Sequence, residues 1–245
     1  MHDGFTVALR AVKKLAGVAA TLLVLNSCFV PEQYEAEIRF TKLGAYGISY
    51  EGVLTQAPFF SELARGNIKD TAPDAAESIK GYTAQLKRDS SFKEVRSIGR
   101  GRFQVRYLRE GNFRGDHQMV TFVSRQAPIF RLRTFDDGRI SIAGSGAGRQ
   151  YAPKLTEVGL NTQGLFRVVT DAEVVEHNAQ FVRQAPTPGY TMYDWRIRSF
   201  ADIPPRLIAK LVVDPRTGGP PKNVESDTSE QDDAELDALL RRSTK

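Results

Sequence analysis

An apolar run near the start of the chain decides which part of it folds. Residues 15–25 (LAGVAATLLVL) contain no charged residue and follow Arg10, Lys13 and Lys14. Eleven helical residues cover about 16 Å, roughly half of a hydrocarbon core of about 30 Å, so the run is too short to span a bilayer. A basic segment followed by such a run and a small residue is typical of a secretory signal. We therefore expect the folded part to begin after residue 27; an uncleaved anchor and a buried core helix are the alternatives.

Cys28 follows this run and is the single cysteine of the chain. A structural disulfide needs two cysteines, so this thiol has no partner within the chain. Residues 25–28 read Leu-Asn-Ser-Cys and resemble the lipobox of bacterial lipoproteins. The resemblance implies that residues 1–27 are removed and that Cys28 carries two or three acyl chains, which anchor a soluble domain at about 0.8 kcal/mol per buried CH₂. Phe29, where inner-membrane lipoproteins have Asp, points to the outer membrane.

Charge is unevenly distributed over the rest of the sequence. Residues 91–150 hold twelve Lys or Arg against five acids, a net charge of +7, whereas residues 222–245 hold four basic residues against seven acids, a net charge of −3. The basic region favours an anionic partner, such as a phospholipid headgroup or a phosphorylated glycolipid. Nucleic acid also fits the charge, but an exported, lipid-anchored protein seldom meets it, so we expect no nucleic-acid partner.

Apolar periodicity predicts an α+β fold, in which an antiparallel sheet has one or two helices packed on it. A second helix is expected from Pro73, with an apolar stripe that includes Ala76 and Leu86. Residues 144–148 read as a flexible glycine loop, and residues 207–213 as either strand or helix. The other expected elements are a hairpin over 32–55, a helix over 58–66, and strands near 102–107, 119–123, 129–135, 139–143, 165–170, 172–176, 180–182 and 190–197.

The chain thus divides into three predicted parts. Residues 1–27 form the signal, residues 28–213 the α+β domain, and residues 214–245 a Pro/Gly linker with an acidic, disordered tail. Residues 226–233 contain no apolar side chain, so this stretch cannot bury enough surface to offset its ordering entropy.

Motifs for catalysis or metal binding are largely missing. His117 and His177 are 60 residues apart, outside the spacing of a local metal-ligand pair. There is no GxSxG elbow, and the glycines of 144–148 match neither a dinucleotide fingerprint nor a P-loop. Asp136 and Asp137 precede Gly138, which is typical of a hairpin turn rather than of paired catalytic carboxylates. We expect no enzyme, no metal and no cofactor; a triad assembled in space around either histidine stays open.

Alternation along two predicted strands brings arginines to the solvent side of a sheet, because successive side chains of a strand point to opposite faces. Phe103 and Val105 are expected inward in one strand, and Phe130 and Leu132 in the other. We predict that one sheet face binds the anionic ligand, and an ordinary solvated face is the alternative. The side chains expected on that face are Arg102, Arg106, Arg131 and Arg133.

Two later segments resemble a known family. The stretch from Phe166 to Ala179 (FRVVTDAEVVEHNA) and the stretch from Met192 to Ile197 (MYDWRI) are similar to the C-terminal part of LppM-type lipoprotein domains. The resemblance implies an envelope lipoprotein with an α+β domain and, in some members, lipid or glycolipid binding. Within these segments Asn178 suits a left-handed or Asx turn, and Trp195 is expected to anchor the core.

These inferences predict a membrane-anchored protein of the cell envelope that faces the periplasm and has a non-enzymatic binding or assembly role. A structural subunit of an envelope or secretion assembly is the alternative function, and an envelope hydrolase is a third.

Overall fold

The computed structural model describes residues 29–114, 119–123 and 128–222, and within these ranges the chain forms two β-sheets and three helices. The seven-stranded sheet contains, in spatial order, β10 (Phe181–Gln184), β11 (Thr191–Ile197), β8 (Gln163–Thr170), β1 (Phe29–Phe40), β2 (Ala45–Gln56), β4 (Arg102–Asn112) and β3 (Phe92–Gly99). The five-stranded sheet contains β5 (Met119–Phe122), β6 (Phe130–Thr134), β7 (Arg139–Gly144), β12 (Arg206–Lys210) and β9 (Glu173–His177). The helices are α2 (Ala57–Ala64), α3 (Pro73–Lys87) and α4 (Ala147–Glu157). The predicted signal, Cys28, His117 and residues 223–245 lie outside the described residues.

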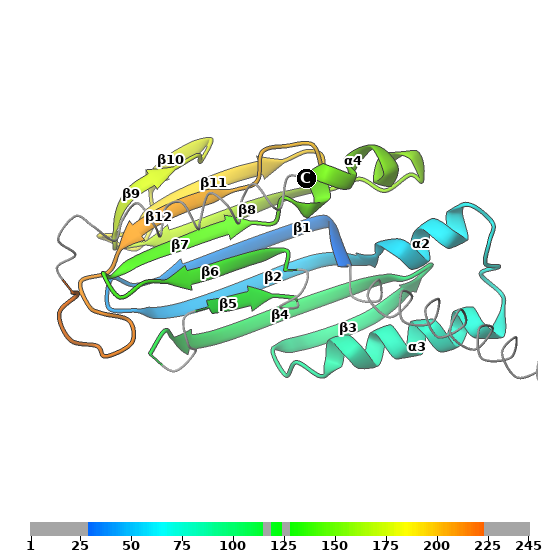
Figure 1. Ribbon diagram of the computed structural model, residues 1–245, viewed down its shortest axis with the longest axis horizontal. Helices are drawn as coiled ribbons and strands as arrows, with labels where there is room; N and C mark the ends of the chain where they lie inside the picture. The colour runs from blue at the N-terminus through cyan, green and yellow to red at the C-terminus, as the bar shows by residue number, and fades with distance from the viewer. Residues whose placement is uncertain (1–28, 115–118, 124–127, 223–245) are drawn as a thin grey trace, which may run out of the picture.

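The two sheets pack face to face around one apolar core (Figure 1). Ile38 and Phe103 of the seven-stranded sheet are fully buried in the same cluster as Phe122 and Leu132 of the five-stranded sheet. Because side chains alternate along each strand, the residues between these point away from the core on both sides of the sandwich. The α+β class is confirmed, but the strands form two sheets where the sequence predicted one.

The predicted hairpin is confirmed as β1 and β2, which pair antiparallel from Phe29–Gln56 to Phe40–Tyr46. The other neighbour of β1 is β8, and this pair is parallel. The seven-stranded sheet is therefore mixed, which local periodicity does not reveal because the two strands are distant in sequence. The last predicted segment, left open between strand and helix, contains strand β12.

Two of the helices lie at the end of the sandwich where β1 begins (Figure 1). Val30 of β1 packs there against Phe60 of α2, Leu155 of α4 and Phe200. The expectation of a glycine loop over 144–148 is wrong for its second half, because α4 begins at Ala147. Packing of its apolar side against Val30 and Phe200 overrides the low helix propensity of the glycines.

The helix predicted from Pro73 is confirmed as α3, which packs against edge strand β3. Its predicted stripe is confirmed at Leu86, which is buried, but wrong at its first position, where Ala75 is buried and Ala76 is exposed. Residues 214–222, predicted as linker, lie against the β6–β7 turn: Arg216 Nη2 is 2.7 Å from Asp136 Oδ2, and the backbone N–H of Lys222 donates to the Asp136 carbonyl.

Candidate functional site

The predicted acylation site adjoins a buried strand without an intervening linker. Phe29, the first residue of β1, is 4% exposed, and its ring lies 6.0 Å from that of Phe103 and 6.4 Å from that of Tyr82. Its backbone pairs with Gln56. A trans peptide bond holds neighbouring Cα atoms about 3.8 Å apart, so an acylated Cys28 would be attached at the surface of the folded domain itself.

The first two candidate arginines lie on β4 and are held in ion pairs on the outward face of the seven-stranded sheet. Arg102 Nε donates to Glu32 Oε1 over 2.8 Å, and its guanidinium lies 4.6 Å from the ring centre of Phe60. Glu32 also accepts the hydroxyl of Thr55. Arg106 Nη2 lies 2.8 Å from Glu94 Oε1 on β3. Both cations are thus neutralised by carboxylates of their own sheet.

The other two candidates, Arg131 and Arg133, lie on β6 and point outward from the five-stranded sheet, because Phe130 and Leu132 fill the core. The prediction that the four arginines share one sheet face is therefore wrong. The strands belong to different layers of a sandwich, and the outward sides of the two layers face in opposite directions. Alternation was read correctly within each strand, but it carries no information about which sheet a strand joins.

We call the outward side of the five-stranded sheet the basic face. Arg133 lies 4.8 Å from the ring centre of Phe135, and no carboxylate of the described residues lies within 4.0 Å of Arg131. Acids at the margin of the face include Asp137, which pairs with Arg139 at 2.5 Å, and Glu176, which pairs with Arg206 at 3.3 Å. The members of the basic face are Arg131, Arg133, Arg139, Arg206 and Lys210.

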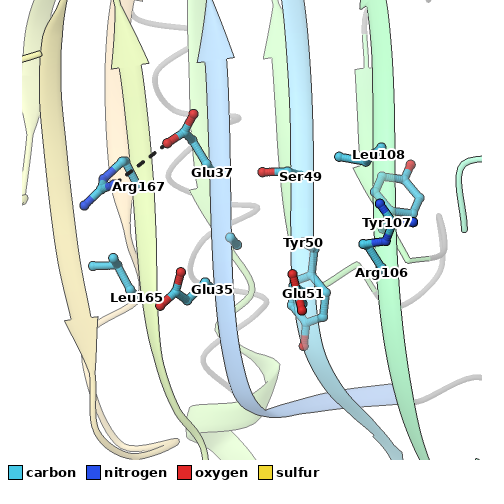
Figure 2. Close-up of a pocket in the computed structure, with 11 residues that line it drawn as sticks. Glu35, Glu37, Ser49, Tyr50, Glu51, Arg106, Tyr107, Leu108, Leu165 and Arg167 are labelled. Atoms are coloured by element: carbon cyan, nitrogen blue, oxygen red, sulfur yellow. Dashed lines mark ion pairs between the residues drawn. The ribbon is translucent and has the colours of Figure 1, made fainter. Parts of the chain in front are cut away.

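A hollow of about 360 Å³ lies on the opposite, seven-stranded side of the sandwich (Figure 2). Its lining mixes charges, with Glu35 and Glu51 directly opposite each other across β1 and β2. Like charges directly opposite each other destabilise a sheet by about 0.2 to 1 kcal/mol. Arg106 and Arg167 complete the charged lining, and Arg167 Nη1 lies 3.9 Å from Glu37. This is not the apolar cavity expected of a lipid pocket.

Beside the hollow, a buried carboxylate holds two arginines. Asp194 of β11 is 4% exposed and accepts from Arg167 Nε over 2.7 Å and from Arg183 Nη2 over 2.6 Å. The hydrogen bond to Asp194 raises the pKa of Arg167 above its usual value, against the opposing effect of burial. The sequence analysis missed this cluster: Asp194 between Tyr193 and Trp195 was a signal for a buried carboxylate, but its two arginine partners come from other strands.

Asn178 connects the two sheets where the chain passes from β9 to β10. Its Oδ1 accepts from Trp195 Nε1 over 2.7 Å and from the backbone N–H of Arg206 over 2.8 Å, and its Nδ2 donates to the Pro204 carbonyl over 2.9 Å. The sequence predicted either a left-handed conformation or an Asx turn for Asn178. The left-handed alternative is wrong, because the backbone of Asn178 does not have a positive φ. Trp195 is 2% exposed, which confirms it as a core residue.

The described candidates for catalysis have structural contacts. His177 Nδ1 accepts from the backbone N–H of Ala179 over 3.1 Å, and its ring packs on that of Tyr193 at 5.0 Å. Asp137 accepts from the backbone N–H of Arg139 over 2.9 Å, which confirms the predicted hairpin turn. Among the described residues no group of three or more His, Cys, Asp or Glu is placed to hold a metal ion.

Comparison with known proteins gives a distant structural likeness and no match in sequence. No protein-family model matches the chain, and no curated protein matches it. The structure is similar to the folded domain of the Mycobacterium tuberculosis LppM protein, solved by NMR, with 13% sequence identity and a TM-score of 0.38; the match covers 76% of this chain and 94% of that domain. No helix within the described ranges is long and apolar enough to cross a membrane. Membership of an LppM-type family stays a prediction.

Proposed function

We propose that this chain is a lipid-anchored protein of the cell envelope that binds an anionic lipid or glycolipid headgroup. The observation that carries the proposal is the Leu-Asn-Ser-Cys stretch at the end of the apolar run. Its cysteine directly precedes strand β1, and the first side chain of that strand, Phe29, is buried. Cleavage before Cys28 would thus leave the entire β1 strand intact. The anchored domain would face the periplasm, from the outer membrane if Phe29 acts as the sorting residue.

The basic face supports the binding part of the proposal. Arg131 has no carboxylate within 4.0 Å among the described residues, and Lys210 of the same face is exposed and equally free of ion pairs. Arginine binds phosphate or carboxylate through two parallel hydrogen bonds, which suits a charged headgroup. The ion pairs of Arg102 and Arg106 leave these two residues less suited to the same task.

Metabolic labelling tests the anchor. Cells that express the full chain are grown with an alkyne analogue of palmitate, and the protein is then partitioned between detergent and water. We expect label on the wild-type chain and none on Cys28→Ser, because the chain has no second thiol. Equal labelling of both chains, or of neither, contradicts the anchor.

Co-purification tests the basic face. Anionic lipid retained by the anchored protein in mild detergent is quantified by mass spectrometry for Arg131→Gln and for Arg106→Gln. We expect less retained lipid for the first variant and no change for the second, since Arg106 is already occupied by Glu94. Equal retention by the two variants excludes the basic face as the binding site.

One observation favours the assembly role as a second candidate. Strands β9 and β10 are edge strands of different sheets, follow each other in the chain, and expose Val175, Phe181 and Val182 by 47–49%. An exposed apolar edge is able to accept a strand from another chain. A photo-crosslinking side chain at Phe181 should then capture a specific envelope protein, whereas capture of lipid alone contradicts this role.

A further inference from the structure

We propose that the helical end of the sandwich rests on the surface of the membrane leaflet that holds Cys28, with anionic lipid headgroups as its ligands. The helical end is defined by the β3–β4 turn (residues 99–101), helix α4 and the loop 198–205. The inference rests on the proposed acylation of Cys28 and adds the orientation of the domain and the surface that it presents.

The start of β1 fixes the distance between anchor and domain. Phe29 and Val30 are 4% and 7% exposed, and Val30 packs with Phe60 of α2 and Leu155 of α4. Cys28 follows at about 3.8 Å along the backbone, so no free segment separates the acyl chains from the core. A strand of this length covers about 40 Å, which places the β1–β2 turn far from the leaflet.

One aromatic residue connects the parts of this end. Phe60 packs in the same cluster as Ala152 and Leu155 of α4 and as Phe200 of the 198–205 loop. The guanidinium of Arg100, in the β3–β4 turn, lies 5.4 Å from the Phe60 ring centre. The turn, the helix and the loop therefore meet around Phe60 beside the start of β1, and Figure 1 shows α2 and α4 at this end.

The charge of this end suits an anionic surface. Arg100, Arg149 and Lys154 are exposed, and no carboxylate of the described residues lies within 4.0 Å of any of them. Asp202, an acid of the loop, is hydrogen-bonded within the loop. It accepts from the backbone N–H of Arg198 over 2.7 Å and from the Ser199 hydroxyl over 3.0 Å. Glu157 is the remaining acid of α4. Basic residues near an anionic leaflet are attracted to it over about one Debye length.

Arg100 also occupies a costly backbone conformation. It has φ +55°, and among the described residues it is the sole one other than glycine with positive φ. Glycine adopts this region without a steric cost, so the turn does not itself require an arginine. The side chain adopts this conformation in the turn beside Phe60, which packs with the start of β1, and this fits a role in contact with headgroups.

Exposed apolar side chains complete the surface. Ile203 in the loop is 67% exposed and Tyr151 on α4 is 48% exposed. An amphipathic Tyr and an aliphatic side chain beside cations are suited to the boundary between headgroups and acyl chains. Leu43, in the β1–β2 turn at the opposite end, is 59% exposed and provides a matched control, because exposure is similar and position differs.

Spin labels measure the orientation directly. Ile203→Cys and Leu43→Cys are made separately in the full acylated chain, in which the lipid blocks Cys28, and each is labelled with a nitroxide in vesicles of phosphatidylcholine and phosphatidylglycerol. We expect the label at 203 to relax faster with membrane-soluble oxygen, and the label at 43 to relax faster with water-soluble nickel. Equal preference for nickel at both positions overturns the orientation. Intact mass of the same samples separates the two failures, since absence of the acyl mass overturns the anchor instead.

A second pair of variants tests the headgroup contacts without a folding defect. Arg100→Gly combined with Lys154→Gln should reduce the effect of oxygen at position 203. It should also weaken the increase in that effect when phosphatidylglycerol is added to the vesicles, although Arg149 remains. Lys42→Gln at the far end should change neither. Because glycine relieves the positive φ, the urea midpoint of the double variant should not fall. Unchanged immersion of the 203 label in the double variant overturns the role of the cations.

Discussion

The two outward faces of the sandwich carry arginines at the same period-2 spacing but in different electrostatic surroundings. On the seven-stranded side, Arg102, Arg106 and Arg167 each lie within 3 Å of a carboxylate. On the five-stranded side, Arg131 has no such neighbour among the described residues, and Arg133 lies over the ring of Phe135. The three arginines of the seven-stranded side are thus paired with acids of their own sheet, whereas Arg131 of the basic face is not paired with an acid of the described residues.

The difference shows what determines whether an arginine is available. Alternation places a side chain on the outward side of its strand, but the neighbouring strand determines whether an acid lies opposite. Strand β4 lies between β2 and β3, which supply Glu51 and Glu94, whereas β6 lies between β5 and β7, which supply Thr121 and Ala143 at the positions paired with Arg131. Pairing across strands therefore decides whether an outward arginine has an acid beside it.

The largest effect that separates the faces is expected at Asp194. Asp194→Ala leaves Arg167 and Arg183 beside a buried site without their carboxylate, and we expect a loss of about 2 to 3 kcal/mol in the free energy of unfolding. Arg131→Ala removes an unpaired side chain of the basic face and should change the free energy of unfolding by less than about 0.5 kcal/mol. Urea denaturation measures both, and similar losses for the two variants would break the comparison.

A smaller loss is expected where the two sheets are joined. Asn178→Ala removes hydrogen bonds to Trp195 and Arg206, so we expect a loss of about 2 kcal/mol in the free energy of unfolding. Asn178→Asp keeps the acceptor oxygen and should lose less. Separate unfolding transitions in the alanine variant, followed by tryptophan fluorescence and far-UV circular dichroism, would show that Asn178 couples two layers. A loss in Asn178→Asp as large as in the alanine variant would contradict the acceptor role.

Removal of acids should make the seven-stranded face resemble the basic face. Glu94→Gln frees Arg106 from its ion pair, but Glu51 lies directly opposite in the β2–β4 register. We therefore expect no change in headgroup affinity for the single variant and a gain of about fivefold for Glu94→Gln combined with Glu51→Gln, which corresponds to about 1 kcal/mol per cation. Flotation with phosphatidylglycerol vesicles measures the gain, and an equal gain for the single variant would exclude Glu51 as the opposing charge.

The smallest effect is a pH dependence at the loop between β11 and β12. Burial alone would raise the pKa of Asp202, but hydrogen bonds from Arg198 and Ser199 lower it below its ordinary value. A lowered pKa in the folded state adds stability above the unfolded pKa of about 3.9, and this stability is lost as the pH falls further. The wild type should therefore be more stable than Asp202→Asn at neutral pH, and the difference should shrink below about pH 4. Ser199→Ala should show part of this effect; a difference that does not depend on pH would contradict it.

Much of the fold was predictable because the strands are amphipathic. The hairpin of β1 and β2, helix α3 and the β6–β7 turn each follow from local signals in the sequence. Strand β3 was not predicted, and Phe92 is the one residue of this edge strand that is buried. Helix α4 was missed because glycines and Pro153 hide it, and its stability comes from distant partners such as Val30.

The candidate site was predictable at the level of single residues only. Arg131 and Arg133 are outward, as the alternation predicts, but their separation from Arg102 and Arg106 depends on which strands pair. The parallel pairing of β1 with β8 is the clearest case, because it joins residues more than a hundred positions apart. Local propensity contains no information on such contacts, and neither does it reveal the Asp194 cluster, which β8, β10 and β11 build together.

Intact-mass measurement of the protein extracted from membranes tests whether Cys28 anchors the chain directly before the folded domain. We expect one species that starts at Cys28 and carries the additional mass of a diacylglyceryl group, with or without a third acyl chain. Cys28→Ser should yield no acylated species. A wild-type chain that still starts at Met1 and has no acyl mass would contradict both the anchor and the membrane orientation derived from it.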